Sequence, residues 1–333
     1  MAKRLSKRSI IGIVCAVLVV LVVGALGFAG NFLFDFALNP HASYTMSDMM
    51  GEGSVDGLET VSPAQDEAYA AEAATWFENT RESTSLVAAD GTELAGWFVA
   101  AATDAGTSHD YAVVCHGYTG EPSEMAKYAY HFNQLGMNTL LPAARGHERN
   151  IDTGYITMGW DDSVDLVQWV NQIVARDPQA RIMLFGVSMG GAEVMMASGR
   201  DLPSNVKLII EDCGYTSVWD EFALQLDNVF GLPSFPLLNT AELVCRVRAG
   251  YGFEEASAVD MLAKATVPML FIHGTADTFV PFSMLDEVYD ACASSEKEKL
   301  VVDNAGHGQS ASTNPDLYWS TVDDFIARYM GTA

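Results

Sequence analysis

An alternation of strand-like and helix-like segments runs from about residue 85 to the C-terminus, and it limits the possible folds more than any other feature. Several of the strand-like runs are apolar throughout, such as YAVVC at 111–115 and MLFIH at 269–273. Strands that are apolar on both faces are typical of a parallel sheet covered by helices on each side. We therefore predict an α/β fold with an eight-stranded, mostly parallel sheet flanked by helices.

The segments of each type are short and regularly spaced. The strand-like runs are residues 85–88, 94–101, 111–115, 138–141, 181–185, 206–211, 268–273 and 299–302. The helix-like runs are residues 123–135, 161–175, 189–199, 283–293 and 314–330. Only a tight turn at Asp90-Gly91 separates the first two strands, which leaves no room for a crossover helix. We expect these two strands to form an antiparallel hairpin at one edge of the sheet.

One long stretch interrupts the alternation. About 55 residues separate the strand that ends at Glu211 from the strand that begins at Pro268. Connections of this length are uncommon unless they have a function. The stretch is rich in aromatic residues, namely Trp219, Phe222, Phe230, Phe235, Tyr251 and Phe253. We predict a small helical cap over the carboxyl end of the sheet, at about residues 215–262; the alternative is that these helices pack away from any site.

The N-terminus carries a long uncharged segment. From Ile10 to Phe28, 19 residues contain neither a charge nor a proline. A helix of that length spans about 28 Å, close to the roughly 30 Å of a membrane's hydrocarbon core. The residues before it include four basic ones: Lys3, Arg4, Lys7 and Arg8. By the positive-inside rule, residues 1–34 are predicted to form a single-pass membrane anchor, with the N-terminus in the cytoplasm and the long acidic remainder of the chain outside.

A cleaved signal peptide is the alternative to an anchor. The apolar part of a signal peptide is usually shorter than this segment, but Ala25-Leu26-Gly27 offers small residues at a cleavage-like spacing. Cleavage there would give a secreted protein.

Residues 35–83 are predicted to form a lead-in to the main domain. Mixed composition indicates an irregular linker from Asn31 to about Gly57. A helix is expected from Ser62 to about Asn79, with Ser62 and Gln65 forming a capping box and Pro63 at the first helical position.

The charge balance excludes some classes of function. The chain has 18 Lys and Arg residues against 43 Asp and Glu residues, a formal charge of −25. Such a chain is a poor binder of nucleic acid, which requires basic side chains to neutralise phosphates. Hydrophobic residues make up 49% of the chain, enough for a full core. The acidity favours solubility and points to no particular substrate.

The strongest chemical signal is Gly186-Val187-Ser188-Met189-Gly190-Gly191. A GxSxG sequence between a strand and a helix is typical of a nucleophile elbow, in which a sharp turn holds the serine hydroxyl above the sheet. The helix that follows favours developing negative charge at its N-terminus. Ser188 is therefore the candidate nucleophile; the alternative is an ordinary glycine-rich turn.

A serine nucleophile requires a base, and the base requires a carboxylate. Among seven histidines, His307 lies in NAGHGQ directly after the last predicted strand, where a loop can bring it over the serine. Asp277 follows the preceding strand in HGTAD. The order Ser188, Asp277, His307 is that of α/β-hydrolases. The alternative carboxylates are Glu211, Asp212 and Asp303.

An oxyanion hole requires backbone N–H groups that point at the developing charge. We expect one from Met189 and the second from Tyr118, in the HGYTG loop that follows the strand at 111–115. The sequence contains no clustered His, Cys or carboxylate metal motif and no phosphate-binding loop, so we predict neither a metal nor a cofactor.

Taken together, the motifs identify a resemblance. HGYTG, RGH at 145–147, GVSMGG, HGTAD and AGHG occur in the order and at the spacing of an α/β-hydrolase fold serine hydrolase, from about residue 84 to 330. MGWDD at 158–162 and DCGYTSV at 212–218 resemble a bacterial branch near the cinnamoyl-esterase and prolyl-oligopeptidase-like groups. One departure is Pro142-Ala143-Ala144, where relatives often place an aspartate before the arginine.

The resemblance implies a hydrolase domain at residues 84–333, with Ser188, Asp277 and His307 as the triad and Tyr118 and Met189 as oxyanion donors. We expect a substrate pocket that includes His116, Tyr118, Tyr215, Trp219 and Phe279. The predicted activity is hydrolysis of a small-molecule carboxylic or acyl ester outside the cytoplasm. A peptidase or an acyltransferase with the same triad is the alternative, and a non-catalytic surface binding protein is a third possibility.

Overall fold

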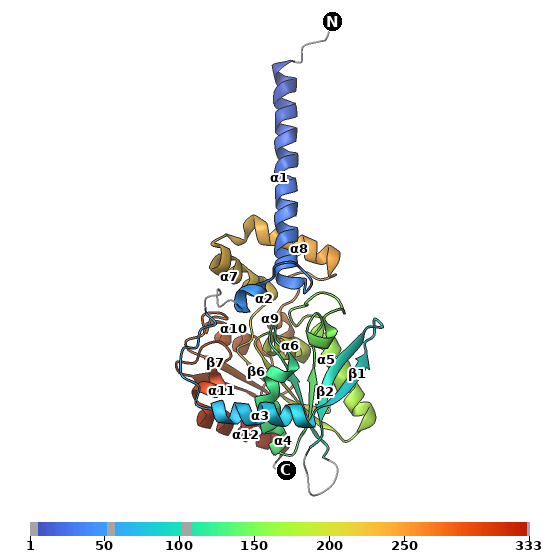
Figure 1. Ribbon diagram of the computed structural model, residues 1–333, viewed down its shortest axis with the longest axis vertical. Helices are drawn as coiled ribbons and strands as arrows, with labels where there is room; N and C mark the ends of the chain where they lie inside the picture. The colour runs from blue at the N-terminus through green and yellow to red at the C-terminus, as the bar shows by residue number, and fades with distance from the viewer. Residues whose placement is uncertain (1–5, 52–56, 102–107, 332–333) are drawn as a thin grey trace.

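Eight strands form one sheet in the order β1-β2-β4-β3-β5-β6-β7-β8 (Figure 1). The computed structural model describes residues 6–51, 57–101 and 108–331. The strands are β1 (Glu82–Val87), β2 (Glu93–Val99), β3 (Asp110–Cys115), β4 (Asn138–Pro142), β5 (Arg181–Val187), β6 (Val206–Asp212), β7 (Met269–Gly274) and β8 (Lys297–Val302). β1 and β2 form the expected antiparallel edge hairpin, and β2 also pairs antiparallel with β4. Strands β3 to β8 are parallel, so the predicted mostly parallel sheet is confirmed.

Alternating residues of the central strands enter two separate cores. Val113 and Leu184 pack in the core on one face of the sheet. Val114 and Phe185, their neighbours along β3 and β5, pack in the core on the other face. Because both faces are covered, the strands have to be apolar throughout, and this produced the sequence pattern.

Helices cover both faces of the sheet. On one face lie α3 (Glu67–Thr80), α4 (Ala126–Gln134) and α12 (Pro315–Met330). On the other lie α5 (Asp162–Arg176), α6 (Met189–Ser198), α9 (Ala258–Leu262) and α10 (Met284–Ala291). Short helical segments complete the body: α2 (Met46–Gly51), η1 (Pro122–Met125), η2 (Glu148–Asn150) and α11 (Ser310–Thr313).

The predicted start of the helix near residue 62 is wrong. α3 begins at Glu67, after Asp66, and no capping box forms. Ser62 donates its hydroxyl to the carbonyl of Asn304 instead, and the Gln65 amide donates to the carbonyl of Thr313. Hydrogen bonds to the C-terminal part of the fold therefore occupy the two side chains that would have capped the helix.

The long insertion between β6 and β7 is helical, as predicted. It contains α7 (Val218–Phe230) and α8 (Ser234–Arg248), followed by α9. α7 and α8 lie at the end of the globular body from which α1 (Lys7–Leu38) projects (Figure 1). We call residues 215–262 the cap.

α1 is the one helix in the described part of the chain that is long and apolar enough to cross a membrane. Lys7 and Arg8 begin it, whereas Lys3 and Arg4 lie outside the described residues. The irregular linker predicted from Asn31 is instead helical through Leu38. Burial against the cap explains the difference, because Phe34, Phe36 and Leu38 are buried there.

The last turns of α1 pack closely on α8. A Cβ atom on Gly30 would lie 2.7 Å from the backbone carbon of Thr240, so only glycine permits this approach. Arg248 of α8 pairs with Asp35 at 2.9 Å and donates to the Asn31 side chain at 2.8 Å. These contacts fix the end of α1 against the body.

Candidate active site

Ser188 lies at the sharp turn between β5 and α6. Its backbone has φ 59° and ψ −119°, a strained conformation for a residue with a side chain. A Cβ atom on Gly186 would lie 2.0 Å from the carbonyl oxygen of Gly190, and a Cβ atom on Gly190 would lie 2.3 Å from that of Cys115. The two glycines are thus required for the turn, as the GxSxG pattern predicts.

The structure brings His307 and Asp277 to this serine. His307 follows β8, and its Nε2 atom lies 2.8 Å from Ser188 Oγ. Its Nδ1 atom lies 2.8 Å from Oδ2 of Asp277, which follows β7. A serine, an imidazole and a carboxylate in this order form the arrangement that nucleophilic catalysis by serine requires.

Asp277 is buried but held in its charged form. Burial alone would raise its pKa, yet hydrogen bonds from His273 and His307 outweigh this effect and keep the pKa below its usual value. The backbone N–H groups of Phe279 and Val280 each donate to its Oδ1 at 3.0 Å. Its position is therefore fixed from several sides, which suits a residue that orients an imidazole.

The alternative carboxylates have other partners. Asp212 accepts a hydrogen bond from the Tyr318 hydroxyl at 2.9 Å, and Glu211 accepts one from the backbone of Gly214. Burial raises the pKa of Glu211 to about 8 and that of Asp212 to about 6. Asp303 is exposed.

The HGYTG loop lies beside Ser188. A Cβ atom on Gly117 would lie 3.9 Å from Ser188 Oγ, so the loop passes close to the hydroxyl. Met189 is fully buried at the first position of α6. Tyr118 contacts the pocket next to Ser188, and its hydroxyl donates to the carbonyl of Ala37 in α1 at 2.6 Å. The end of α1 is thereby hydrogen-bonded to this loop.

His116 does not line the pocket, contrary to the prediction. Both of its ring nitrogens have backbone partners: Nδ1 lies 2.8 Å from the carbonyl of Gly117, and Nε2 accepts from the N–H of Ala144 at 3.0 Å. His147 accepts from the N–H of Thr119 in the same way, at 3.0 Å. Burial lowers the pKa of both histidines to about 4, so both are neutral near pH 7. Their hydrogen bonds link the HGYTG loop to the loop that follows β4.

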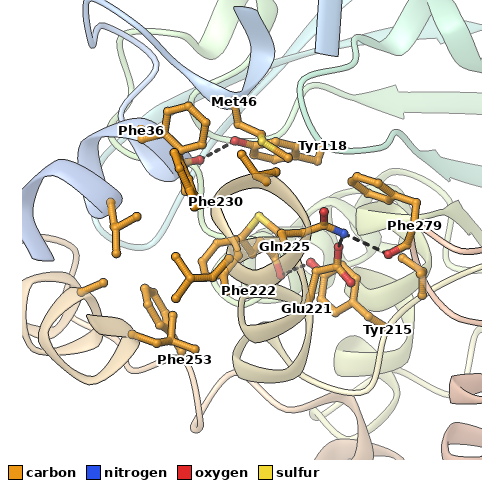
Figure 2. A pocket seen from close by; sticks show the side chains of 18 of the residues that line it. Phe36, Met46, Tyr118, Tyr215, Glu221, Phe222, Gln225, Phe230, Phe253 and Phe279 are labelled. Atoms are coloured by element: carbon orange, nitrogen blue, oxygen red, sulfur yellow. Dashed lines mark hydrogen bonds between the residues drawn. The ribbon is translucent and has the colours of Figure 1, made fainter. Parts of the chain in front are cut away.

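An apolar pocket opens at Ser188 (Figure 2). Tyr118, Tyr215 and Phe279 line it, as the sequence predicts. Trp219 does not line it; Phe222 and Phe253, whose ring centroids are 4.9 Å apart, contribute to the wall instead. The pocket extends between α1, α2, α7 and α8, with further lining by Leu33, Phe36, Ala37, Met46, Leu226, Val229, Phe230, Leu238 and Ala241.

The α1 and α2 residues of this wall were not predicted to belong to the site. They lie some 150 residues before Ser188 in the sequence, in a segment whose apolar character had been attributed to a membrane anchor and a linker. Leu33, Phe36 and Ala37 recur at the i, i+3 and i+4 spacing of one helix face, and this pattern beyond Phe28 is the signal that could have indicated a packed helix end.

Two polar side chains interrupt the apolar lining. Gln225 of α7 donates to Glu221 Oε1 at 2.9 Å and to the carbonyl of Phe279 at 3.0 Å (Figure 2). Glu221 is buried, which raises its pKa to about 8 and keeps it neutral at lower pH. Glu221 Oε2 and Gln225 Oε1 have no hydrogen-bond partner among the described residues. No motif or spacing in the sequence marks these two residues as part of the site.

Comparison with known proteins places the chain in a family. A model of the prolyl oligopeptidase family matches residues 125–333. YqkD, an uncharacterized protein of Bacillus subtilis, is 27% identical over 254 residues, which cover 75% of this chain and 81% of YqkD.

Two solved structures share the fold. An esterase of Pyrococcus furiosus superposes with a TM-score of 0.60 at 20% identity, over 75% of this chain and 91% of the esterase. The acylaminoacyl peptidase of Pyrococcus horikoshii gives a TM-score of 0.57 at 18% identity, over 78% of this chain and 43% of the peptidase.

Proposed function

This chain belongs to the prolyl oligopeptidase family and is an α/β-hydrolase fold serine hydrolase, and on this premise we propose that it hydrolyses carboxylic esters through an acyl-enzyme on Ser188. One observation carries the proposal: Ser188 Oγ, the His307 ring and the Asp277 carboxylate are linked by two contacts of 2.8 Å each. Such a chain allows the imidazole to take the serine proton as the hydroxyl attacks a carbonyl carbon.

The reaction has two halves. In the first, His307 removes the Ser188 proton, the Oγ atom bonds to the carbonyl carbon, and the alcohol leaves with the proton that His307 returns. In the second, His307 takes a proton from water, the water oxygen attacks the acyl-enzyme, and the acid leaves as Ser188 regains its proton. Asp277 stays ionised throughout and stabilises the charged imidazole.

The backbone N–H groups of Tyr118 and Met189 are the proposed donors to the oxyanion. Met189 begins α6, so its N–H belongs to the first turn, where helix N–H groups lack a partner within the helix. The approach of Gly117 to Ser188 supports a second donor from the same loop. Fixed donors of this kind stabilise the charge that develops on the carbonyl oxygen.

The mostly apolar lining of the pocket supports a substrate with an apolar acyl group. Its lining includes no lysine or arginine among the described residues, so nothing there pairs with a carboxylate. A peptidase remains the second candidate, because the matching family is named for an oligopeptidase and a structural neighbour is an acylaminoacyl peptidase.

The proposed location is the outer side of a membrane. α1 is apolar and exposed over most of its length, and Lys7 and Arg8 begin it. By the positive-inside rule the N-terminus would lie in the cytoplasm. When membranes are extracted at alkaline pH, an anchored chain would stay in the membrane fraction and a cleaved one would be released. Protease added to intact cells would digest the globular body if it lies outside.

The ester assignment is tested with two substrates that share an acyl group. p-Nitrophenyl butyrate and butyryl p-nitroanilide differ only in the bond that is cleaved. We expect the full-length protein in detergent to cleave the ester at least about a hundredfold faster, corrected for the uncatalysed rates. Faster cleavage of the anilide would favour the peptidase, and cleavage of neither would contradict both.

A further inference from the structure

The membrane helix and the wall of the pocket are one continuous element. α1 runs without a break from Lys7 to Leu38. Most of its apolar side chains are exposed up to Phe28, whereas Gly30 already touches the backbone of α8. The residues that line the pocket follow within two turns. The part of α1 that lines the pocket is therefore the direct continuation of its exposed apolar part.

The pocket between these helices suits a hydrocarbon chain. α1 contributes Leu33, Phe36 and Ala37, and α8 contributes Leu238 and Ala241. The hydroxyls of the two tyrosines in the lining already donate hydrogen bonds within the protein, Tyr118 to the carbonyl of Ala37 and Tyr215 to the carbonyl of Met158. Each methylene group buried in such a lining favours binding by about a factor of four.

The cap, whose helix α8 packs against α1, carries exposed apolar side chains. Within 18 residues of the chain, five large apolar side chains are exposed: Phe230, Leu232, Phe235, Leu243 and Val247. We call these residues the apolar cap surface. Phe235 and Val247 are each 77% exposed, and a gathering of exposed apolar side chains is typical of a surface that contacts a protein or a membrane. α7 and α8 lie at the end of the body nearest the exposed part of α1 (Figure 1), so a bilayer crossed by α1 lies on the same side.

We propose that the substrate is a membrane lipid ester whose acyl chain passes from the bilayer, along α1 and the apolar cap surface, into the pocket at Ser188. The inference rests on the proposed function and names its substrate class. Ser188 Oγ bonds to the acyl carbon, the bond to the lipid alcohol breaks, and the alcohol takes the proton from His307. Water then releases a fatty acid and restores the serine.

The test uses the full-length protein in phosphatidylcholine nanodiscs. Two esters with the same leaving group are compared: p-nitrophenyl butyrate, which is soluble, and p-nitrophenyl palmitate, which dissolves in the bilayer. We expect kcat/KM for the palmitate to exceed that for the butyrate by about tenfold or more. A ratio of one or less overturns the inference, while hydrolysis of neither ester contradicts the proposed function itself.

Variants that narrow the pocket test whether the acyl chain of the substrate lies between α1 and α8. Ala241→Phe and Leu33→Trp place large side chains between α1 and α8, and we expect each to lower the palmitate-to-butyrate ratio by about tenfold. Leu33 is only partly buried, so Leu33→Trp tests the position of the acyl chain even if Ala241→Phe does not fold. An unchanged ratio in a folded variant overturns the assignment of the pocket.

A matched pair tests the route from the bilayer. Val247→Ser alters the apolar cap surface, whereas Val87→Ser makes the same change on β1, where Val87 is 68% exposed. We expect Val247→Ser to reduce palmitate hydrolysis severalfold relative to butyrate hydrolysis. The double variant Leu243→Ser/Val247→Ser should show a larger reduction, and Val87→Ser should match the wild type. Equal ratios in all of these proteins would overturn the route.

Discussion

The two sides of the pocket are built in different ways. On one side, Ser188, Asp277 and His307 each follow a parallel strand, so the ends of β5, β7 and β8 bring them together. On the other side, α1, α7 and α8 meet through side-chain packing and one close backbone contact at Gly30. The first side holds the residues proposed to break the bond, and the second lines the proposed substrate pocket.

This difference separates reaction class from substrate choice. Strand ends in a parallel sheet are fixed by the backbone, so short motifs there carry the same chemistry in many proteins. Packed helices respond to every change in side-chain size, which makes them suited to selecting a substrate. Cleavage after Gly27 would remove most of the exposed part of α1 but retain residues 30–38, so a secreted form would keep the helix end that lines the pocket.

The largest effect is expected from removing the nucleophile. Ser188→Ala should lower kcat for p-nitrophenyl butyrate by roughly 10⁴-fold to 10⁶-fold, because triad residues act as a unit. Ser198→Ala, at the other end of the same helix, is the matched control and should retain wild-type turnover. Near-normal activity of Ser188→Ala would show that the chemistry takes place elsewhere.

The orienting carboxylate comes next. Asp277→Asn should reduce kcat by about 10³-fold to 10⁴-fold, because an amide no longer holds His307 in the required tautomer. Asp303→Asn changes an exposed aspartate near His307 in the sequence and serves as the control. If the two variants lost activity equally, the assignment of Asp277 would be wrong.

A smaller effect is expected from separating α1 from the cap. Gly30→Leu forces α1 away from the backbone of Thr240, and we expect kcat/KM to fall by about tenfold as the pocket wall and the contact of Ala37 with Tyr118 shift. Gly27→Leu makes the same change one turn earlier, where nothing lies within 4 Å, and should behave as wild type. Melting temperatures of both variants would show whether the body stays folded; equal activity would contradict a role for α1.

The smallest predicted effect concerns stability and pH. Folded Glu221 keeps its proton up to about pH 8, whereas the unfolded chain releases it near pH 4.3. The folded state thus binds more protons between these values, so this residue lowers stability as pH rises through that window. Glu221→Gln cannot titrate, and its melting temperature relative to wild type should rise from about pH 5 to pH 8.

Glu287→Gln on the exposed side of α10 is the control for this measurement. If the difference in melting temperature between Glu221→Gln and wild type stays constant with pH, Glu221 is not the neutral, buried group described for the pocket.

The same comparison explains how far the sequence could predict the structure. All eight strands, and the five helices predicted from the strand–helix alternation, were predicted close to their observed bounds, because continuous apolar runs and glycine-rich turns reflect local backbone requirements. Ser188, Asp277 and His307 were recognisable for the same reason: each lies in a short motif directly after a strand.

The rest of the site depended on contacts between distant segments. His116 was assigned to the pocket because it follows a strand, but its ring nitrogens bond to Gly117 and Ala144. The docking of α1 depends on Gly30 and Arg248, which are 218 positions apart in the sequence. The prediction of an irregular linker after Asn31 was wrong, because burial of Phe34, Phe36 and Leu38 stabilises a helix that local composition does not favour.

The most direct measurement is covalent labelling of the full-length protein with a fluorophosphonate, followed by mass spectrometry of its peptides. The account predicts one labelled residue, Ser188, with labelling retained in Ser198→Ala, lost in Ser188→Ala and slowed in Gly30→Leu. Absence of label on folded wild-type protein, or label at another serine, would contradict it.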